Sequence, residues 1–161
     1  MNLKTLVLSA LLGAILHAAK FAMSGLPNIE PVTLLLLCYA LAFGFPCAFS
    51  AAAVFILLEG LLYGFNLWWV SYCYIWPLWL GVVFLLRKNR AAPVWAAAAG
   101  GFGLLFGALC ALPYFAGGPA MALSYWVSGI PFDLLHCVGN FVLTLLLLKP
   151  LLRLFERVKR S

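Results

Sequence analysis

Three polar side chains stand in a segment that is otherwise typical of a membrane-spanning helix. The stretch SGIPFDLLHCVGNFVLTLLLLKP carries Asp133, His136 and Asn140 among apolar residues. Their spacing places all three on one stripe of a helix. A charge at the centre of a spanning helix costs about 2.5–3.5 kcal/mol on insertion scales, so such residues face protein or water and usually serve a function. The spacing predicts one wall of a pocket, although for Asn140 a hydrogen bond between helices is an equal alternative.

An aromatic-rich stretch, GFNLWWVSYCYIWPLW, supplies candidate groups for binding a planar ring. Tyr72, Trp76 and Trp79 recur at helical spacing along one side of it. Aromatic walls with a few aimed polar groups are typical of a small-molecule site, but the same pattern is typical of core packing. Trp68 and Trp69 are expected in the aromatic belt at the membrane interface.

Two further charged residues, Lys20 and Glu59, lie near the ends of apolar segments. Opposite charges that enter a membrane usually pair with each other. We expect Lys20 to form an internal ion pair with Glu59 or with Glu30, in preference to a contact with substrate.

Membrane-spanning helices must position these residues, because the chain has too little charge to cover a soluble surface. Of its 161 residues, 66% are hydrophobic and 9% are charged, whereas a soluble domain has roughly 25% charged residues. We therefore predict a single all-α integral membrane domain over residues 1–161. A signal peptide is the alternative for the first segment, but its apolar run continues past the small residues as far as Met23.

Breaks in hydrophobicity divide the chain into six expected spans, the second of which is short. A spanning helix needs roughly 20 apolar residues. The expected helices cover residues 3–23, 31–45, 47–63, 69–86, 93–115 and 125–152.

The basic residues predict how these six helices are oriented. Most of them lie in two clusters, Arg87-Lys88-Asn89-Arg90 and the tail from Lys149 to Arg160, each directly after an apolar run. Lys4 falls on the same side if the helices alternate in direction. Cytoplasmic flanks of membrane helices are rich in Lys and Arg, so we expect both termini in the cytoplasm. The same placement argues against a nucleic-acid-binding patch.

The chain lacks the usual motifs of cofactor and energy chemistry. It contains neither a phosphate-binding Gly-Lys-Ser/Thr loop nor a GxGxxG turn. Its five cysteines form no CxxC pair that would suggest a metal or a disulfide. Asp133 and His136 have no nucleophile or metal set beside them, so we expect no enzyme, no metal and no cofactor.

Three features occur together in a pattern that resembles a known family. Ala10, Ala14 and Ala18 form a small-residue stripe that lets another helix approach closely. The stretch PNIEPVTLL opens the second segment, and GIPFDLLHCVGNF opens the sixth. With the chain length, the six spans and the basic tail, these features resemble the substrate-binding S component of energy-coupling factor (ECF) transporters over nearly the whole chain. They match no particular vitamin-specific member.

The resemblance implies a protein of the prokaryotic cell membrane that captures a small nutrient from outside. Family members associate with a transmembrane T component and two cytoplasmic ATPases, which explains the lack of an ATP motif here. The stripe of Ala10, Ala14 and Ala18 would contact the T component. The ligand would lie between residues 28–30, 63–69 and 124–140.

We expect the ligand to be a heteroaromatic vitamin or vitamin precursor, for which a thiamine-like pyrimidine is one candidate. The expected contacts are polar groups on the last helix, rings that stack on the ligand and asparagines that close the outer lid: Asp133, His136 and Asn140; Tyr72, Trp76 and Trp126; Asn28 and Asn66. Two alternatives are a stand-alone transporter of small solutes and an accessory membrane subunit that binds no ligand.

Overall fold

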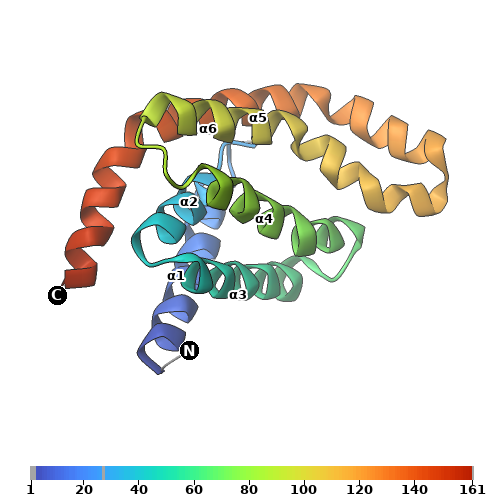
Figure 1. Ribbon diagram of the computed structural model, residues 1–161. Coiled ribbons are helices and arrows are strands. Elements are labelled where there is room, and N and C mark those ends of the chain that lie inside the picture. The colour runs from blue at the N-terminus through green and yellow to red at the C-terminus, as the bar shows by residue number, and fades with distance from the viewer. Residues whose placement is uncertain (1–2, 27, 161) are drawn as a thin grey trace.

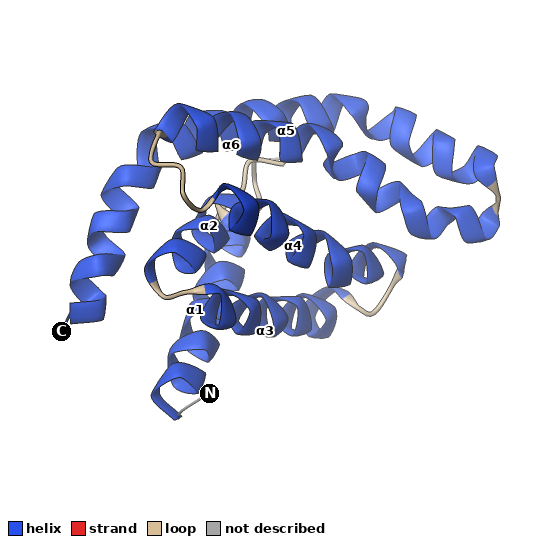
Figure 2. Ribbon diagram, viewed as in Figure 1, coloured by secondary structure: helices blue, strands red, loops and turns tan. Residues whose placement is uncertain are grey.

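A computed structural model describes residues 3–26 and 28–160 of the chain. This part consists of helices joined by short loops and contains no strand (Figures 1 and 2). The helices are α1 (Leu3–Ala22), α2 (Val32–Ala42), α3 (Phe45–Tyr63), α4 (Leu67–Leu86), α5 (Ala92–Ala111), the 3-10 helix η1 (Leu112–Gly117) and α6 (Pro119–Arg160).

The helices confirm the prediction of an all-helical membrane protein. Among the described residues, five helical segments are long and apolar enough to cross a bilayer, whereas α2 is shorter. Exposed leucines, valines and phenylalanines are spread over their outer faces. A bilayer covers such residues without the polar surface that water would require.

The short helix α2 lies at the centre of the bundle. It is apolar on every side, and almost all of its residues are buried. Its 11 residues give a length of about 16 Å, roughly half of the hydrocarbon thickness of a bilayer. Trp79 of α4 fixes it laterally, since the indole Nε1 donates to the Thr33 carbonyl at 2.9 Å. Because α2 is so short, the centre of the bundle has room for a cavity beyond the start of this helix.

Helices α5 and α6 form a long hairpin whose tip projects beyond the other helices (Figure 1). Glycines let the two backbones approach closely. A Cβ atom at Gly103 would lie 2.7 Å from the carbonyl oxygen of His136, and one at Gly100 would lie 3.2 Å from that of Cys137. This contact holds the polar stripe of α6 in position.

The predicted bounds of the last helix are wrong at both ends. Residues expected in an outer loop belong to η1 and to the first turns of α6, which begins at Pro119. Proline is tolerated in the first turn, where no donor is needed, and Gly118 supplies the turn with φ of +103°. The basic tail continues the helix, and Lys159 donates to the Ala42 carbonyl at the end of α2 at 2.8 Å.

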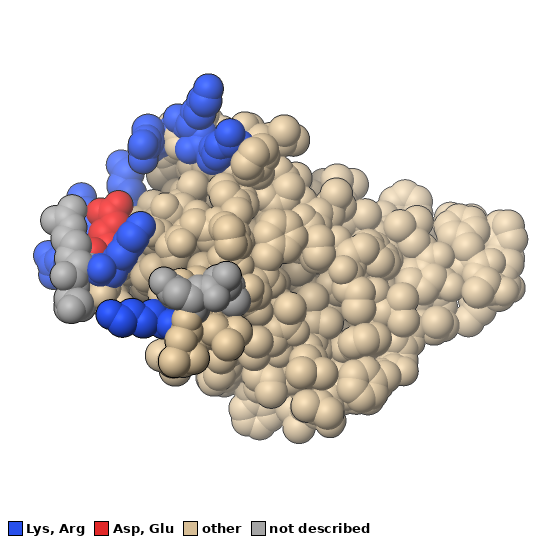
Figure 3. Space-filling model, turned by 60° about the horizontal axis from the view of Figure 1, so that its bottom comes forward, with Lys and Arg blue, Asp and Glu red and all other residues tan. Residues whose placement is uncertain are grey.

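Basic side chains gather at one end of the molecule. Lys4 lies at the start of α1, and residues 87–90 join α4 to α5. Figure 3 shows Lys and Arg at the end opposite the tip of the α5–α6 hairpin, which is free of charge on this face. The two ends of the bundle therefore differ strongly in charge.

Candidate functional site

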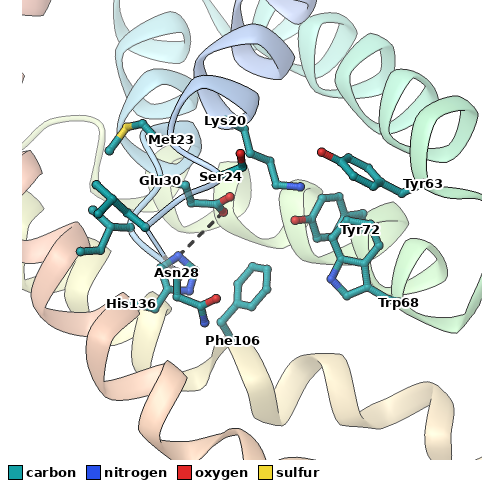
Figure 4. Close-up of a pocket in the computed structure, with 12 residues that line it drawn as sticks. Lys20, Met23, Ser24, Asn28, Glu30, Tyr63, Trp68, Tyr72, Phe106 and His136 are labelled. Atoms are coloured by element: carbon teal, nitrogen blue, oxygen red, sulfur yellow. Dashed lines mark ion pairs between the residues drawn. The ribbon is translucent and has the colours of Figure 1, made fainter.

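A cavity of about 470 Å3 lies beyond the start of α2, at the end of the bundle away from the two basic clusters. The end of α1, the loop from α1 to α2, the junction of α3 with α4, and single residues of α5 and α6 surround it (Figure 4). Its lining residues are Lys20, Met23, Ser24, Leu26, Asn28, Ile29, Glu30, Tyr63, Trp68, Tyr72, Phe106 and His136.

Glu30 and His136 form the polar centre of this cavity. The Nε2 atom of His136 lies 3.9 Å from Oε1 of Glu30, and the two side chains are 2% and 12% exposed, respectively. Neither ring nitrogen of His136 has a hydrogen-bond partner within the described part of the chain. Phe106 packs edge-on against the imidazole, with ring centroids 4.8 Å apart. Buried polar groups normally have partners, so these atoms are available to a bound molecule.

Burial also changes the acidity of Glu30, which lies in the loop outside the spanning helices. Loss of water around the carboxyl raises its pKa from 4.5 to about 7, although the nearby charge of Lys20 acts in the opposite direction. Glu59 adds a smaller effect that raises the pKa. With this raised pKa the carboxyl can accept a hydrogen bond when ionised and donate one when neutral.

Lys20 is held in a cage of three aromatic rings beside the cavity. Its ammonium group lies 5.2 Å from the centroid of Tyr63, 4.8 Å from Trp68 and 5.4 Å from Tyr72. Such contacts stabilise a cation by about 0.5–2 kcal/mol each. The ammonium group also forms an ion pair with Oε2 of Glu59.

The predicted ion pair between Lys20 and Glu59 is therefore confirmed. The second oxygen of Glu59 lies 2.7 Å from Nδ1 of His17. Glu59 itself is 1% exposed, so both of its oxygens are satisfied by α1. The charge of Lys20 is mostly balanced by the protein, while its position still exposes it to the cavity.

Asn28 connects the loop over the cavity to α6. Its side-chain Nδ2 donates to the Phe132 carbonyl at 3.2 Å. Its φ of +53° lies in the left-handed region, which asparagine tolerates better than most residues. This side chain holds the loop down on the site.

A smaller cavity of about 290 Å3 lies beside the first one, around Asp133. Asn28, Trp68 and Phe106 line both cavities. The Oδ1 atom of Asp133 accepts from the Gly107 N–H at 2.8 Å. Its Oδ2 atom is buried and has no hydrogen-bond partner among the described residues.

The structure brings four of the eight predicted ligand contacts to these two cavities. Asn28, Tyr72 and His136 line the main cavity, and Asp133 lines the smaller one. The other four lie elsewhere: Trp76, Asn140, Asn66 and Trp126.

None of these four lines either cavity, and for Trp76 and Asn140 the structure shows the stated alternatives of core packing and a bond between helices. Trp76 is fully buried among rings of α3 and α5. Asn140 donates to Oγ1 of Thr33 at 3.3 Å, which is the alternative of a bond between helices. Asn66 caps α4 by accepting from the Trp69 N–H at 3.0 Å, and Trp126 is 40% exposed. Helical spacing alone does not tell which of several neighbours a side chain faces.

The site prediction omits four side chains that prove central to the cavity. Lys20 forms the expected ion pair and also lines the cavity. Trp68, which was expected in the aromatic belt, lies in the segment 63–69 predicted around the ligand and lines the cavity as well. Glu30 is the last residue of the segment 28–30 and Tyr63 is the first residue of the segment 63–69. Both segments were predicted around the ligand, but neither residue was predicted as an individual contact. A carboxyl group next to the start of a short apolar helix is the signal that could have identified Glu30.

The lining of the cavity offers hydrogen-bonding groups and aromatic rings to a small molecule. Within the described residues, no three His, Cys, Asp or Glu side chains form a group that could hold a metal ion. The cavity combines one acid, one unpaired imidazole, a balanced ammonium group and several rings. These groups can recognise a planar polar molecule by stacking and by hydrogen bonds.

No protein-family model, curated protein or solved structure matches this chain. The fold and its surface define the class, which is a multi-pass helical membrane protein. Its cavity is the basis for a more specific assignment.

Proposed function

We propose that this protein is the substrate-capture subunit of an ECF-type importer in a prokaryotic cell membrane. It binds a small heteroaromatic vitamin or vitamin precursor from the outer side. The observation that carries this proposal is the cavity above α2, where the unpaired, buried His136 faces Glu30 between aromatic walls.

The proposed orientation has six crossings with both termini in the cytoplasm. Helix α2 forms the second crossing, and because it is short it leaves part of the bilayer depth to the ligand. The charge distribution in Figure 3 supports this orientation, because basic residues favour the cytoplasmic side. The cavity then opens toward the outside.

The size and lining of the cavity support a ligand of vitamin size. Ligand pockets commonly have volumes of about 300–1,000 Å3 and a few polar groups among apolar walls. Trp68, Tyr72 and Phe106 offer rings for stacking, while Glu30 and His136 offer hydrogen bonds to ring nitrogens or substituents. A planar heterocycle uses both kinds of contact.

The exposed face of α1 supports docking to a T component, and two ATPases bound to that partner would supply the energy. Ala10, Ala14 and Ala18 are all exposed along this face. On the buried side of α1, Gly13 packs against α3, where a Cβ atom would lie 2.6 Å from that of Val54. The small residues on the outer face would let a partner helix approach in a similar way.

Capture of a nutrient can be tested with purified protein in detergent or nanodiscs. Mass spectrometry of co-purifying small molecules should identify a heteroaromatic compound, which is then titrated while the tryptophan emission is recorded. Trp68 lines the cavity, whereas Trp126 is exposed outside it. The ligand should quench the emission of the wild type and of Trp126→Phe, and most of the quenching should be lost in Trp68→Phe.

Two results would contradict the proposal. If no heteroaromatic compound co-purifies and no compound of a vitamin panel changes the emission, the protein is better described as an accessory subunit. If quenching depends on Trp126 instead of Trp68, the ligand binds outside the cavity described here.

A further inference from the structure

The smaller cavity contains a carboxylate whose hydrogen bonds the protein leaves incomplete. Asp133 is 3% exposed. Its Oδ1 atom accepts one hydrogen bond from the Gly107 N–H, while Oδ2 has no partner among the described residues. An ionised carboxylate can accept several hydrogen bonds, and burying it without them is costly.

Helix α5 makes room for this carboxylate. A Cβ atom at Gly107 would lie 2.4 Å from Oδ2 of Asp133 and 2.6 Å from Oδ1. Any side chain at this position would displace the carboxyl group. Glycine therefore both supplies the N–H donor and leaves space at the second oxygen.

The protein provides no countercharge at this place. Within the described chain, the residues that line the smaller cavity include no Lys, Arg or His. Lys20 is already paired with Glu59. An ionised Asp133 can therefore be balanced only by a cation on a bound molecule.

The two cavities are neighbours and can hold two parts of one molecule. They share Asn28, Trp68 and Phe106 as lining residues. Asp133 and His136 lie about one turn apart on α6, at a rise of roughly 1.5 Å per residue. A ring between the aromatic walls can thus carry a short arm toward Asp133.

We infer that the cavity around Asp133 is a second subsite, which binds a protonated amine or amidine group attached to the ring held in the main cavity. This inference rests on the proposed function, and it narrows the ligand to heteroaromatic compounds with a cationic nitrogen arm. Asp133 accepts from that nitrogen through Oδ2, while the Gly107 N–H keeps the carboxylate in position.

The test uses a matched pair of probes, benzylamine and benzyl alcohol, which differ in the cationic group. Their dissociation constants are measured by ligand-observed NMR on the full-length protein in nanodiscs at pH 7. Hydrogen bonds to charged groups are stronger than neutral ones, so the wild type should bind benzylamine about tenfold more tightly than benzyl alcohol.

Two variants assign this preference to one carboxylate. Asp133→Asn keeps an acceptor for the Gly107 N–H and removes the charge, so the preference should fall to about one. Glu156→Gln removes an exposed carboxyl near the end of α6, outside both cavities, and should leave the preference in place. If the preference is absent in the wild type, survives in Asp133→Asn or disappears in Glu156→Gln, the second subsite is wrong.

A third variant covers the case in which Asp133→Asn does not fold. Gly129 lines the smaller cavity, and a Cβ atom there would meet nothing within 4 Å. Gly129→Met should fill this cavity and abolish the amine preference without changing any charge. Retention of the preference in Gly129→Met would overturn the inference.

The test of the second subsite and the test of the proposed function can fail independently of each other. If a co-purified nutrient quenches the emission of Trp68 but the probes show no amine preference, only the second subsite fails. If the probes show the preference but no nutrient is captured, the subsite stands and the function as a capture subunit fails.

Discussion

At the scale of single residues, the chemistry of this protein lies in a few polar groups that the apolar bundle keeps from water. The sequence alone identifies Asp133 and His136 as such groups, because a hydrocarbon environment rejects them. It does not identify their partners, since Gly107 and Glu30 come from other elements. Polar residues inside membrane segments can be predicted from composition, but their pairing depends on tertiary contacts.

The acidity of Glu30 predicts how the stability of the ligand-free protein depends on pH. The pKa of this carboxyl is about 7 in the folded protein and 4.5 when unperturbed, because burial disfavours the charged form. Because its pKa is higher in the folded than in the unfolded protein, this carboxyl makes its full contribution to the free energy of unfolding below pH 4.5. That contribution is lost as the pH rises through 7. The other charged and titratable groups around Glu30 are unchanged when Glu30 alone is replaced: Lys20, Glu59, His136 and Tyr72.

We therefore expect Glu30→Gln to match the wild type in thermal stability near pH 5 and to exceed it at pH 8. The difference should be on the order of 1–3 kcal/mol, and it can be measured as a shift in Tm in detergent at both pH values. A ligand that donates to the ionised carboxyl should oppose this trend by binding the wild type more tightly at pH 8. Equal Tm differences at pH 5 and pH 8 would show that Glu30 does not titrate in this range.

At the scale of elements, the positions of helices were easier to predict than their ends. The first five predicted segments agree with α1 to α5 within a few residues, because breaks such as SGLPN, GFP and RKNR interrupt the apolar runs. The last helix is longer than predicted at both ends. Its start follows a 3-10 turn, and its end is supported by the contact of Lys159 with α2, which no local pattern reveals.

The contact between α5 and α6 makes a sharp prediction about two glycines in one helix. Gly103→Ala puts a methyl group 2.7 Å from the backbone of His136, whereas Gly101→Ala meets nothing within 4 Å. Overpacking against a backbone costs about 1–3 kcal/mol, and a helical Gly→Ala change in open space gains up to about 1 kcal/mol. Gly103→Ala should lower the Tm, and Gly101→Ala should keep or raise it.

These two variants also report on the site. Because Gly103 positions His136, ligand quenching of Trp68 should weaken in Gly103→Ala but not in Gly101→Ala. Equal Tm values for both variants would mean that α5 and α6 are not as close as described.

At the scale of the whole molecule, composition alone gives the class, while the cavity requires the fold. Low charge and long apolar runs predict a helical membrane protein, and the helices confirm it. The cavity exists because the central helix α2 is short, and its lining comes from the other five helices and from the loop between α1 and α2. Such a property depends on how helices pack in three dimensions, so the sequence predicted only part of the site.

The proposed orientation predicts which positions can be labelled from outside the cell. In a background without the five native cysteines, Asn89→Cys lies in the basic loop and Phe115→Cys lies near the tip of the α5–α6 hairpin. A membrane-impermeant maleimide should label Phe115→Cys in intact cells and Asn89→Cys only after permeabilisation. The reverse pattern would place the cavity on the cytoplasmic side.

Docking through α1 predicts a separation of transport from binding. Ala14 is exposed in the middle of the small-residue stripe, so Ala14→Trp should block the approach of a partner helix while the cavity stays intact. Leu85→Trp is a matched control, because Leu85 is 81% exposed on α4, away from the stripe.

With the T component and both ATPases co-expressed, uptake of the co-purified nutrient should fall at least about tenfold in Ala14→Trp, a loss of more than about 1.4 kcal/mol in coupling. Leu85→Trp should transport normally, and both variants should retain quenching through Trp68. Normal uptake by Ala14→Trp, or uptake by the wild type without the partner subunits, would instead indicate a stand-alone transporter.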